Sequence, residues 1–259
     1  MHKLIEVNVL PDTKTESGRT LVIGDIHGTL ASLLNVMEKC NYAENDKLIV
    51  LGDLCDGYPE SAQVVDYFYE MQLTREIIFI KGNHDAWLEE FLFTGIASKH
   101  WLTQGGKATV ESYNRLLGKQ PEKLELHSEL LRKFIPYYID ERNRIFVHGG
   151  FYPQISIAAN KRLYGDEIFM WDRDLVEYAA QKIDSKVSFI PTEEGFIEIF
   201  VGHTSTTNYK STKPLNLKNL WMLDTGAGWD GKLTVMDVNT KQYWQSDYSK
   251  NYYPNHIHD

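Results

Sequence analysis

Carboxylate and imidazole side chains occur close together at several points of this sequence, and the first such pair is Asp25 and His27. The pair follows the apolar run 21–23 and is separated by one residue, so in an extended chain both side chains point to one face. A carboxylate beside an imidazole offers the mixed oxygen and nitrogen donors that suit a divalent transition metal. Taken alone, the pair is equally consistent with a polar turn at the end of a strand.

Three short apolar runs in the first third of the chain are each followed by a glycine and a polar residue: 20–23, 47–51 and 76–80. The polar residues are Asp25, Asp53 and Asn83, and helical patterns at about 30–40 and 61–72 separate the runs. This alternation predicts a βαβαβ unit with a parallel sheet. Because the carboxyl ends of parallel strands meet at one edge, we expect the three polar side chains to converge in space.

Apolar runs later in the chain end in similar motifs. Strands are predicted at 144–147, 199–201 and 220–223, and they end in His148-Gly149-Gly150, Gly202-His203-Thr204 and Asp224-Thr225-Gly226. Two alternating runs, about 232–237 and 242–246, predict an antiparallel hairpin turned by Asn239-Thr240. The polar and aromatic tail from Tyr248 onward is expected to add little.

The segments between these strands are predicted to contain a helical cap, a helix and a flap. Residues 85–135 are predicted to form a mainly helical cap packed on the sheet. A helix over about 167–182, with Asp166 as its N-cap, is expected to carry Arg173. The segment 185–197 contains Pro191 and Gly195 and is a candidate flap. Since no repeat or low-complexity linker divides the chain, we expect a single domain over residues 1–259.

Composition and charge narrow the functional classes. The chain has 259 residues and a formal net charge of -9, so its surface repels a phosphate backbone and nucleic acid is not an expected partner. The two cysteines, Cys40 and Cys55, form no disulfide framework, which predicts a reducing, cytoplasmic location. Cys55 is expected to be a buried core residue. No apolar run is long enough for a membrane span, so no membrane partner is expected.

The motifs taken together resemble those of the calcineurin-like metallophosphoesterases, and most closely the compact bacterial and phage serine/threonine protein phosphatases. The resemblance covers nearly the whole chain and is carried by five motifs: Gly24-Asp25-Ile26-His27, Gly52-Asp53-Leu54-Cys55-Asp56, Gly82-Asn83-His84-Asp85, Val147-His148-Gly149 and Gly202-His203-Thr204. It implies an α/β (α+β) fold, a four-layer sandwich of two mixed β-sheets flanked by helices.

The same resemblance implies a binuclear metal centre and a phosphorylated substrate, either a protein or a small molecule. Asp25 and His27 would hold one divalent ion and Asp53 would bridge both, while the second ion would be completed by Asn83, His148 and His203. Mn²⁺ is the expected metal, with iron or zinc as alternatives. Two such ions leave the site net positive, so that it can attract phosphate and activate a water molecule.

Other residues take catalytic roles by the same resemblance. His84 would be the general acid and Asp56 would fix its tautomer, while Arg173 and Asn83 would contact the substrate phosphate. The sequence departs from the family at Gly57, where an arginine that binds phosphate is expected.

Several polar residues near the motifs have simpler interpretations. Asp85 is interpreted as a helix N-cap, Asp224 as a stabiliser of a glycine-rich turn, and Trp229 as a packing residue at the pocket rim. The remaining histidines are taken as surface or structural residues: His2, His100, His127, His256 and His258.

Three functions remain open from the sequence. The first is a metal-dependent phosphomonoesterase, with phosphoserine or phosphothreonine in proteins as candidate substrates. The second is a symmetrical diadenosine tetraphosphate hydrolase, although those enzymes usually keep the arginine and lack the second aspartate of the motif around Asp53. The third is a phosphoesterase fold kept as a non-catalytic scaffold, which the full set of expected ligands disfavours.

Overall fold

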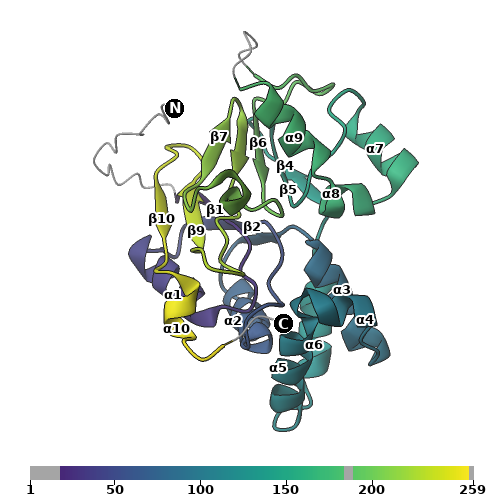
Figure 1. Cartoon of the computed structure of the whole chain (residues 1–259), viewed down its shortest axis with the longest axis vertical. Coiled ribbons are helices and arrows are strands. Elements are labelled where there is room, and N and C mark those ends of the chain that lie inside the picture. Colours follow the sequence, from purple (N-terminus) through teal and green to yellow (C-terminus); the bar gives the residue numbers. More distant parts are fainter. Residues whose placement is uncertain (1–17, 184–188, 257–259) are drawn as a thin grey trace.

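The computed structural model describes residues 18–183 and 189–256, and its first sheet contains the predicted βαβαβ unit. The sheet has five strands in the order β10-β9-β1-β2-β3 (Figure 1). These strands are β1 (Thr20–Ile23), β2 (Lys47–Val50), β3 (Ile77–Phe79), β9 (Thr234–Asp237) and β10 (Tyr243–Gln245). β1, β2 and β3 are parallel and are connected by α1 (Leu30–Lys39) and α2 (Ser61–Gln72), as predicted. The predicted C-terminal hairpin, β9 and β10, adds antiparallel strands beside β1.

The second sheet also has five strands, in the order β4-β5-β6-β8-β7. They are β4 (Tyr137–Ile139), β5 (Arg144–Val147), β6 (Glu198–Val201), β7 (Leu215–Leu217) and β8 (Leu220–Met222). The predicted strands β5, β6 and β8 form a parallel centre, while β4 and β7 pair antiparallel at the two edges. The sequence pattern missed both edge strands, each of which is only three residues long.

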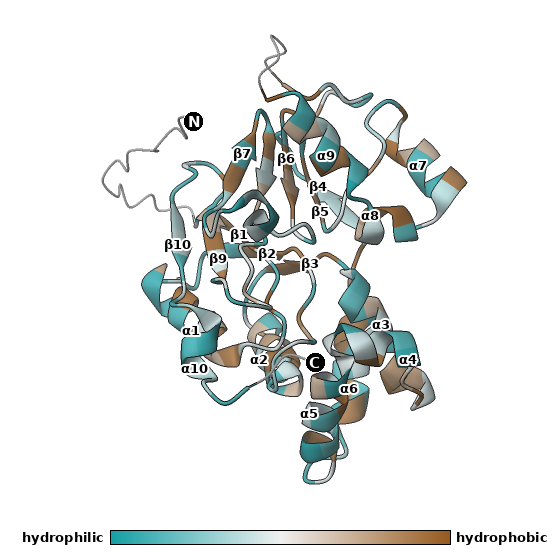
Figure 2. Cartoon of the chain, in the orientation of Figure 1, coloured by the Kyte–Doolittle hydropathy of each residue, from teal (hydrophilic) through white to brown (hydrophobic). Residues whose placement is uncertain are grey.

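Alternating apolar side chains assemble the sheets into layers. In β1, Leu21 and Ile23 face a core shared with α1 and α2, whereas Val22 packs between the sheets with Phe146 and Phe200. A third core lies between the second sheet and the helices that follow β5. Figure 2 shows apolar colours on strands of both sheets, such as β7 and β9, and on parts of the helices. The predicted four-layer α/β sandwich is confirmed.

The predicted helical region 85–135 contains several short elements. They are α3 (Asn83–Thr94), α4 (Lys99–Trp101), the kinked turn η1 (Leu102–Gly106), α5 (Lys107–Leu117) and α6 (Lys123–Leu131). Buried side chains such as Leu88, Tyr113 and Leu130 join the core that lies beneath the first sheet. Among the described helices, none is both long and apolar enough to cross a membrane.

The prediction of one continuous helix over 167–182 is wrong. The segment forms α8 (Glu167–Trp171) and α9 (Asp174–Gln181), and Asp172 between them is extended with ψ 136°. The Asp172 carboxylate accepts a hydrogen bond from Leu175 N at 3.1 Å, which starts α9. Asp166 is the N-cap residue of α8, as predicted, but it makes no side-chain capping hydrogen bond, and its carboxylate pairs with Lys161 at 2.9 Å. A further helix, α7 (Ile157–Tyr164), precedes this region and was not predicted.

The candidate flap and the C-terminal tail both contact the rest of the fold. In the candidate flap 185–197, Ile190 and Phe196 are buried in the core of the second sheet, while residues 184–188 lie outside the described part. The expectation that the C-terminal tail adds little is wrong. The tail contains α10 (Ser249–Tyr252), and Ser249 is buried with its hydroxyl 3.0 Å from that of Ser32 on α1.

Candidate active site

The loops after β1 and β6 bring Asp25 and His203 together from the two sheets. The backbone N–H of His203 donates a hydrogen bond to Asp25 Oδ2 at 2.9 Å. This contact requires glycine at position 202, because a Cβ there would lie 2.2 Å from Asp25 Oδ1. Asp25 and His203, the first and last predicted metal ligands in the sequence, therefore lie at one edge of the sandwich, as predicted.

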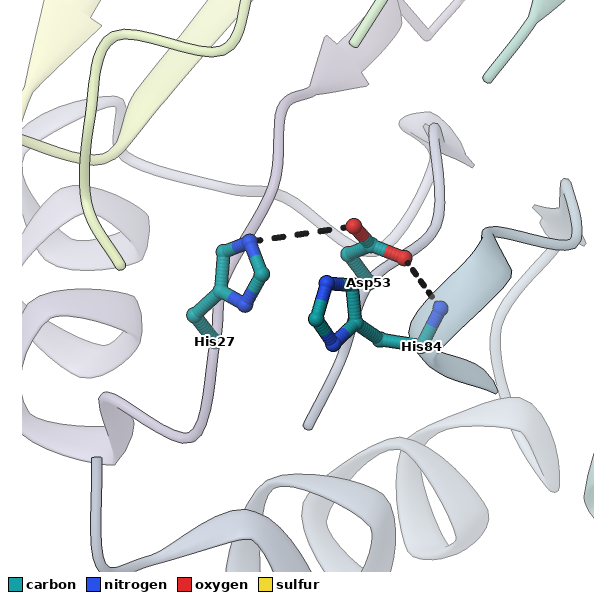
Figure 3. Close-up of side chains that lie close together, drawn as sticks. All are labelled: His27, Asp53 and His84. Atoms are coloured by element: carbon teal, nitrogen blue, oxygen red, sulfur yellow. Dashed lines mark hydrogen bonds and ion pairs between the residues drawn. The ribbon is translucent and has the colours of Figure 1, made fainter. Parts of the chain in front are cut away.

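Asp53, at the end of β2, lies at the centre of the cluster (Figure 3). Its Oδ1 accepts a hydrogen bond from the backbone N–H of His84 at 3.0 Å. Its Oδ2 lies 3.2 Å from His148 Nε2 and 3.7 Å from His27 Nε2. A Cβ at Gly82 would lie 2.1 Å from Asp53 Oδ1, so glycine before Asn83 makes this close approach possible.

Backbone carbonyls orient two of the histidines. His148 Nδ1 lies 2.7 Å from the Leu51 carbonyl, and His27 Nδ1 lies 3.1 Å from the Cys55 carbonyl. A proton on each Nδ1 satisfies these contacts and turns the Nε2 lone pair toward Asp53, which is the arrangement of a metal-ligating histidine. Asn83 belongs to the same group, since its Oδ1 is 3.1 Å from His148 Nε2.

Two buried polar atoms of this cluster have no hydrogen-bond partner, Asp25 Oδ1 and His203 Nε2. Burial raises the pKa of Asp25, and nearby Asp224 raises it further. Burial lowers the pKa of His203 to about 2 and that of His27 to about 4. Unpartnered acceptors and neutral imidazoles around buried carboxylates are what bound cations would satisfy, so these residues fit a metal centre.

The donor atoms form two overlapping groups that share Asp53. One group contains His27, Asp53 and His84, and the other contains Asp53, His148 and His203, with the donor atoms of each group within 4.8 Å of one another. His148 differs from His27 and His203: burial opposes its protonation, yet the adjacent Asp53 raises its pKa to about 10. Asp53 belongs to both groups, whereas the predicted ligand Asp25 belongs to neither and His84 stands in the first group instead.

His84 projects from the first turn of α3 beside Asp53, and Asp56 holds its ring. His84 Nδ1 lies 2.6 Å from Asp56 Oδ2. Burial disfavours the charged imidazole, but Asp53 and Asp56 together raise the pKa of His84 above its ordinary value. Asp56 is completely buried and receives two further hydrogen bonds at 2.6 Å, from Trp101 Nε1 and from Thr109 Oγ1. This carboxylate therefore holds the His84 ring beside Asp53.

The interpretation of Asp85 as an N-cap is wrong, because the N-cap of α3 is Gly82. Asp85 lies in the first turn, and its carboxylate accepts hydrogen bonds from the backbone N–H groups of Gly82, Asp53 and Leu54 at 2.7–2.9 Å. It therefore fixes the loop after β2 against the start of α3. Asp224 accepts from Gly226 N at 2.8 Å, which confirms its predicted role in the glycine-rich turn.

A cavity of about 190 Å³ opens beside this cluster. Among its lining residues are the predicted site residues His27, Asp53, His84, Arg173 and His203. Sequence reasoning did not assign four further lining residues, Gln104, Ser205, Thr207 and Asn208. No local motif marks them, although Ser205, Thr207 and Asn208 closely follow the Gly202-His203 motif in the sequence.

Arg173 reaches the cavity from the break between α8 and α9. Its Nη1 donates to the His203 carbonyl at 3.0 Å and lies 3.3 Å from Thr204 Oγ1. Asn83, the other predicted phosphate contact, is buried against His148 and does not line the cavity. Trp229 lies at the rim, as predicted, and the residue is 55% exposed.

The structure also places Cys55 and most of the remaining histidines. Cys55 is buried and free, as predicted. His127 is a structural residue, buried between Tyr113 and Asp66. His256 lies 2.5 Å from the Gly57 carbonyl, and His100 packs against Trp87. His2 and His258 lie outside the described residues.

Two mixed five-stranded sheets with a carboxylate and imidazole cluster at their common edge define a metallophosphoesterase fold. A model of the calcineurin-like phosphoesterase family matches residues 18–220, and the chain belongs to that family. It is a hydrolase acting on phosphoric esters. The family uses a binuclear metal centre, in agreement with the candidate ligands found here.

Known proteins similar to this chain carry different specificities. A symmetrical bis(5'-nucleosyl)-tetraphosphatase of Pseudomonas syringae pv. syringae (strain B728a) is 22% identical over 274 residues, spanning 86% of this chain and 90% of the relative. The crystal structure of a presumed diadenosine tetraphosphatase has a TM-score of 0.58 at 17% identity, over 90% of this chain and 95% of that one. A serine/threonine phosphatase structure from Saccharomyces cerevisiae has a TM-score of 0.54 at 13% identity, over 86% and 74% of the two chains. These structures establish the fold.

Proposed function

We propose that this protein is a metal-dependent phosphomonoesterase that acts on alkyl phosphates, with phosphoserine and phosphothreonine residues of proteins as its best candidate substrates. The observation that carries the proposal is the 2.6 Å contact between His84 Nδ1 and Asp56 Oδ2 beside the cavity. An alkoxide is a poor leaving group and needs a proton as the ester bond breaks. His84, with its raised pKa, is placed to donate that proton.

The charge of the cavity supports a substrate with one phosphate group. Arg173 is the single lysine or arginine among the described residues that line the cavity. The lining residues that sequence reasoning did not assign are neutral amides and hydroxyls: Gln104, Ser205, Thr207 and Asn208. A phosphate monoester dianion needs less positive charge than a tetraphosphate chain, so this lining favours the monoester.

We assign the site residues roles that their positions support. Asp25, His27, Asp53, Asn83, His148 and His203 would hold two divalent cations, for which Mn²⁺ is our expectation. Bound cations would supply the positive charge that attracts phosphate and lower the pKa of the attacking water. Arg173 contributes a planar donor on the cavity wall, and His84 holds the proton for the leaving group, with Asp56 fixing its ring.

A second candidate function is symmetrical cleavage of dinucleoside tetraphosphates. The sequence relatives with that name support it, since the similarity extends over most of both chains. Its leaving group is a nucleoside diphosphate, which departs without a strong general acid. The two candidates therefore differ in how much they require His84.

The test is a comparison of purified protein on three substrates with added Mn²⁺, after its bound metals are measured. We expect kcat/KM for a phosphoserine or phosphothreonine peptide to exceed that for diadenosine tetraphosphate by at least about tenfold, with 4-nitrophenyl phosphate as a reference. Asp53→Asn is the control, because it should lose metal and all three activities together. A preference for the tetraphosphate, with two molecules of ADP as products, would reverse the order of the two candidates.

A further inference from the structure

Position 57 has no room for an arginine in an unstrained conformation. Gly57 has a φ angle of +82°, a region that residues with a Cβ rarely adopt. A Cβ there would also lie 3.2 Å from the Gly228 carbonyl. Because Gly57 lines the cavity, the substrate side of the site is left without a side chain at this point.

The kinked turn η1 lies directly against this gap. Gly57 N donates a hydrogen bond to the Gly105 carbonyl at 3.2 Å. Gly105 has a φ angle of +92°, and a Cβ on it would lie 2.6 Å from Gly57 N, so the two backbones meet with no side chain between them. The neighbouring residue Gln104 lines the same cavity as Gly57.

The turn that presents Gln104 is firmly anchored on its other side. Gln104 has non-helical angles, φ -113° and ψ 28°, which break the path from α4 into α5. Gly106 packs on the buried Trp101 ring so closely that a Cβ would lie 2.6 Å from it. Trp101 in turn donates to Asp56. The turn therefore holds the exposed Gln104 at the cavity while its base is fixed.

We propose that Gln104 is a substrate-binding residue whose side-chain amide donates a hydrogen bond to a phosphate oxygen, in place of a cation at position 57. The proposal rests on the proposed phosphoesterase function and names the ligand group at one wall of its site. A neutral amide adds a directed hydrogen bond without adding charge. Arg173 then supplies the charged contact and Gln104 the neutral one, a combination suited to a single phosphate group.

The direct test measures the binding of inorganic phosphate to the Mn²⁺-loaded protein by titration calorimetry. We expect Gln104→Ala to weaken phosphate binding about tenfold, the effect of one hydrogen bond to a charged group. Gln104→Glu, which is nearly isosteric, should weaken it more, because a carboxylate repels phosphate. Gln120→Ala, at an exposed glutamine in the loop after α5, is the matched control and should leave binding unchanged.

Kinetics on 4-nitrophenyl phosphate separate binding from a structural role. A binding role raises KM about tenfold and changes kcat by less than about twofold. A role confined to supporting Trp101 and Asp56 would lower kcat with KM unchanged, and that result would overturn the proposal. Phosphate binding by both Gln104 variants within about twofold of the parent would overturn it as well. If the parent protein hydrolyses none of the test substrates, the proposed function fails, whereas the phosphate titration still decides the role of Gln104.

Discussion

Trp101 Nε1 donates a hydrogen bond to Asp56 Oδ2 at 2.6 Å, and His84 Nδ1 contacts the same carboxylate oxygen at the same distance. The indole thus fixes the carboxylate that orients the proposed acid. Trp101→Phe keeps most of the packing and removes the donor, so we expect kcat on alkyl phosphates to fall about tenfold. Steady-state kinetics of the variant check this, with Trp244→Phe on β10 as the control. Equal activity of the two variants would show that Thr109 alone holds Asp56.

His84→Asn should leave metals bound and slow turnover of alkyl phosphates by roughly 10²–10⁴-fold, the usual contribution of general acid–base catalysis. The loss should be smaller for 4-nitrophenyl phosphate, because nitrophenolate leaves without a proton. Metal analysis and parallel assays on the two substrates provide the measurement. An equal loss on both substrates would argue against a proton-donor role.

Gly202→Ala should weaken metal binding although it replaces none of the proposed ligands. The added Cβ would lie 2.2 Å from Asp25 Oδ1, so Asp25 or the His203 loop must move. We expect metal affinity to fall at least about tenfold, as found for disruption of supporting contacts around metal ligands. Gly118→Ala is the control, since its Cβ meets a single backbone oxygen far from the site, at 3.2 Å. Metal content after dialysis distinguishes the two variants.

Arg173→Ala should lower kcat/KM by at least about tenfold, because a charged hydrogen-bond donor is lost from the cavity wall. Arg173→Lys should restore only part of the activity, since Arg173 also holds the His203 carbonyl and a lysine lacks the planar fork. Kinetics must be paired with metal analysis, so that displacement of His203 is recognised. Activity within about twofold of the parent would mean that another group binds the phosphate.

We expect the buried His127, which lies outside the site, to contribute to the loss of folding stability at acid pH. Burial lowers its pKa in the folded protein, although Asp66 opposes the shift and Lys123 adds to it. The unfolded chain therefore binds a proton that the folded chain rejects, so stability falls as the pH drops below about 6.5, the ordinary histidine pKa. Urea unfolding at pH 7.5 and 5.5 should show a smaller acid loss for His127→Gln than for the parent. An identical loss would place the acid sensitivity elsewhere.

The sequence by itself determined the elements that carry the proposed ligands. The runs that form β1, β2 and β3 end in Asp25, Asp53 and Asn83, and parallel pairing alone requires those ends to meet. Strand periodicity and motif order likewise placed His148 and His203 after strands of the second sheet. These features are local, because a glycine and a polar residue after an apolar run reveal a strand end without reference to distant residues.

Only the tertiary structure decided how the site is supported and what faces the substrate. Trp101 contacts Asp56 across 45 residues of sequence, and Gly105 packs on the backbone of Gly57 in a contact that no local pattern encodes. Arg173 was expected on a helix but lies at a break, which the Asp172 carboxylate creates by capping α9. Such contacts depend on the three-dimensional approach of separate elements, and their energies come from burial and hydrogen bonds between residues that are remote in the sequence.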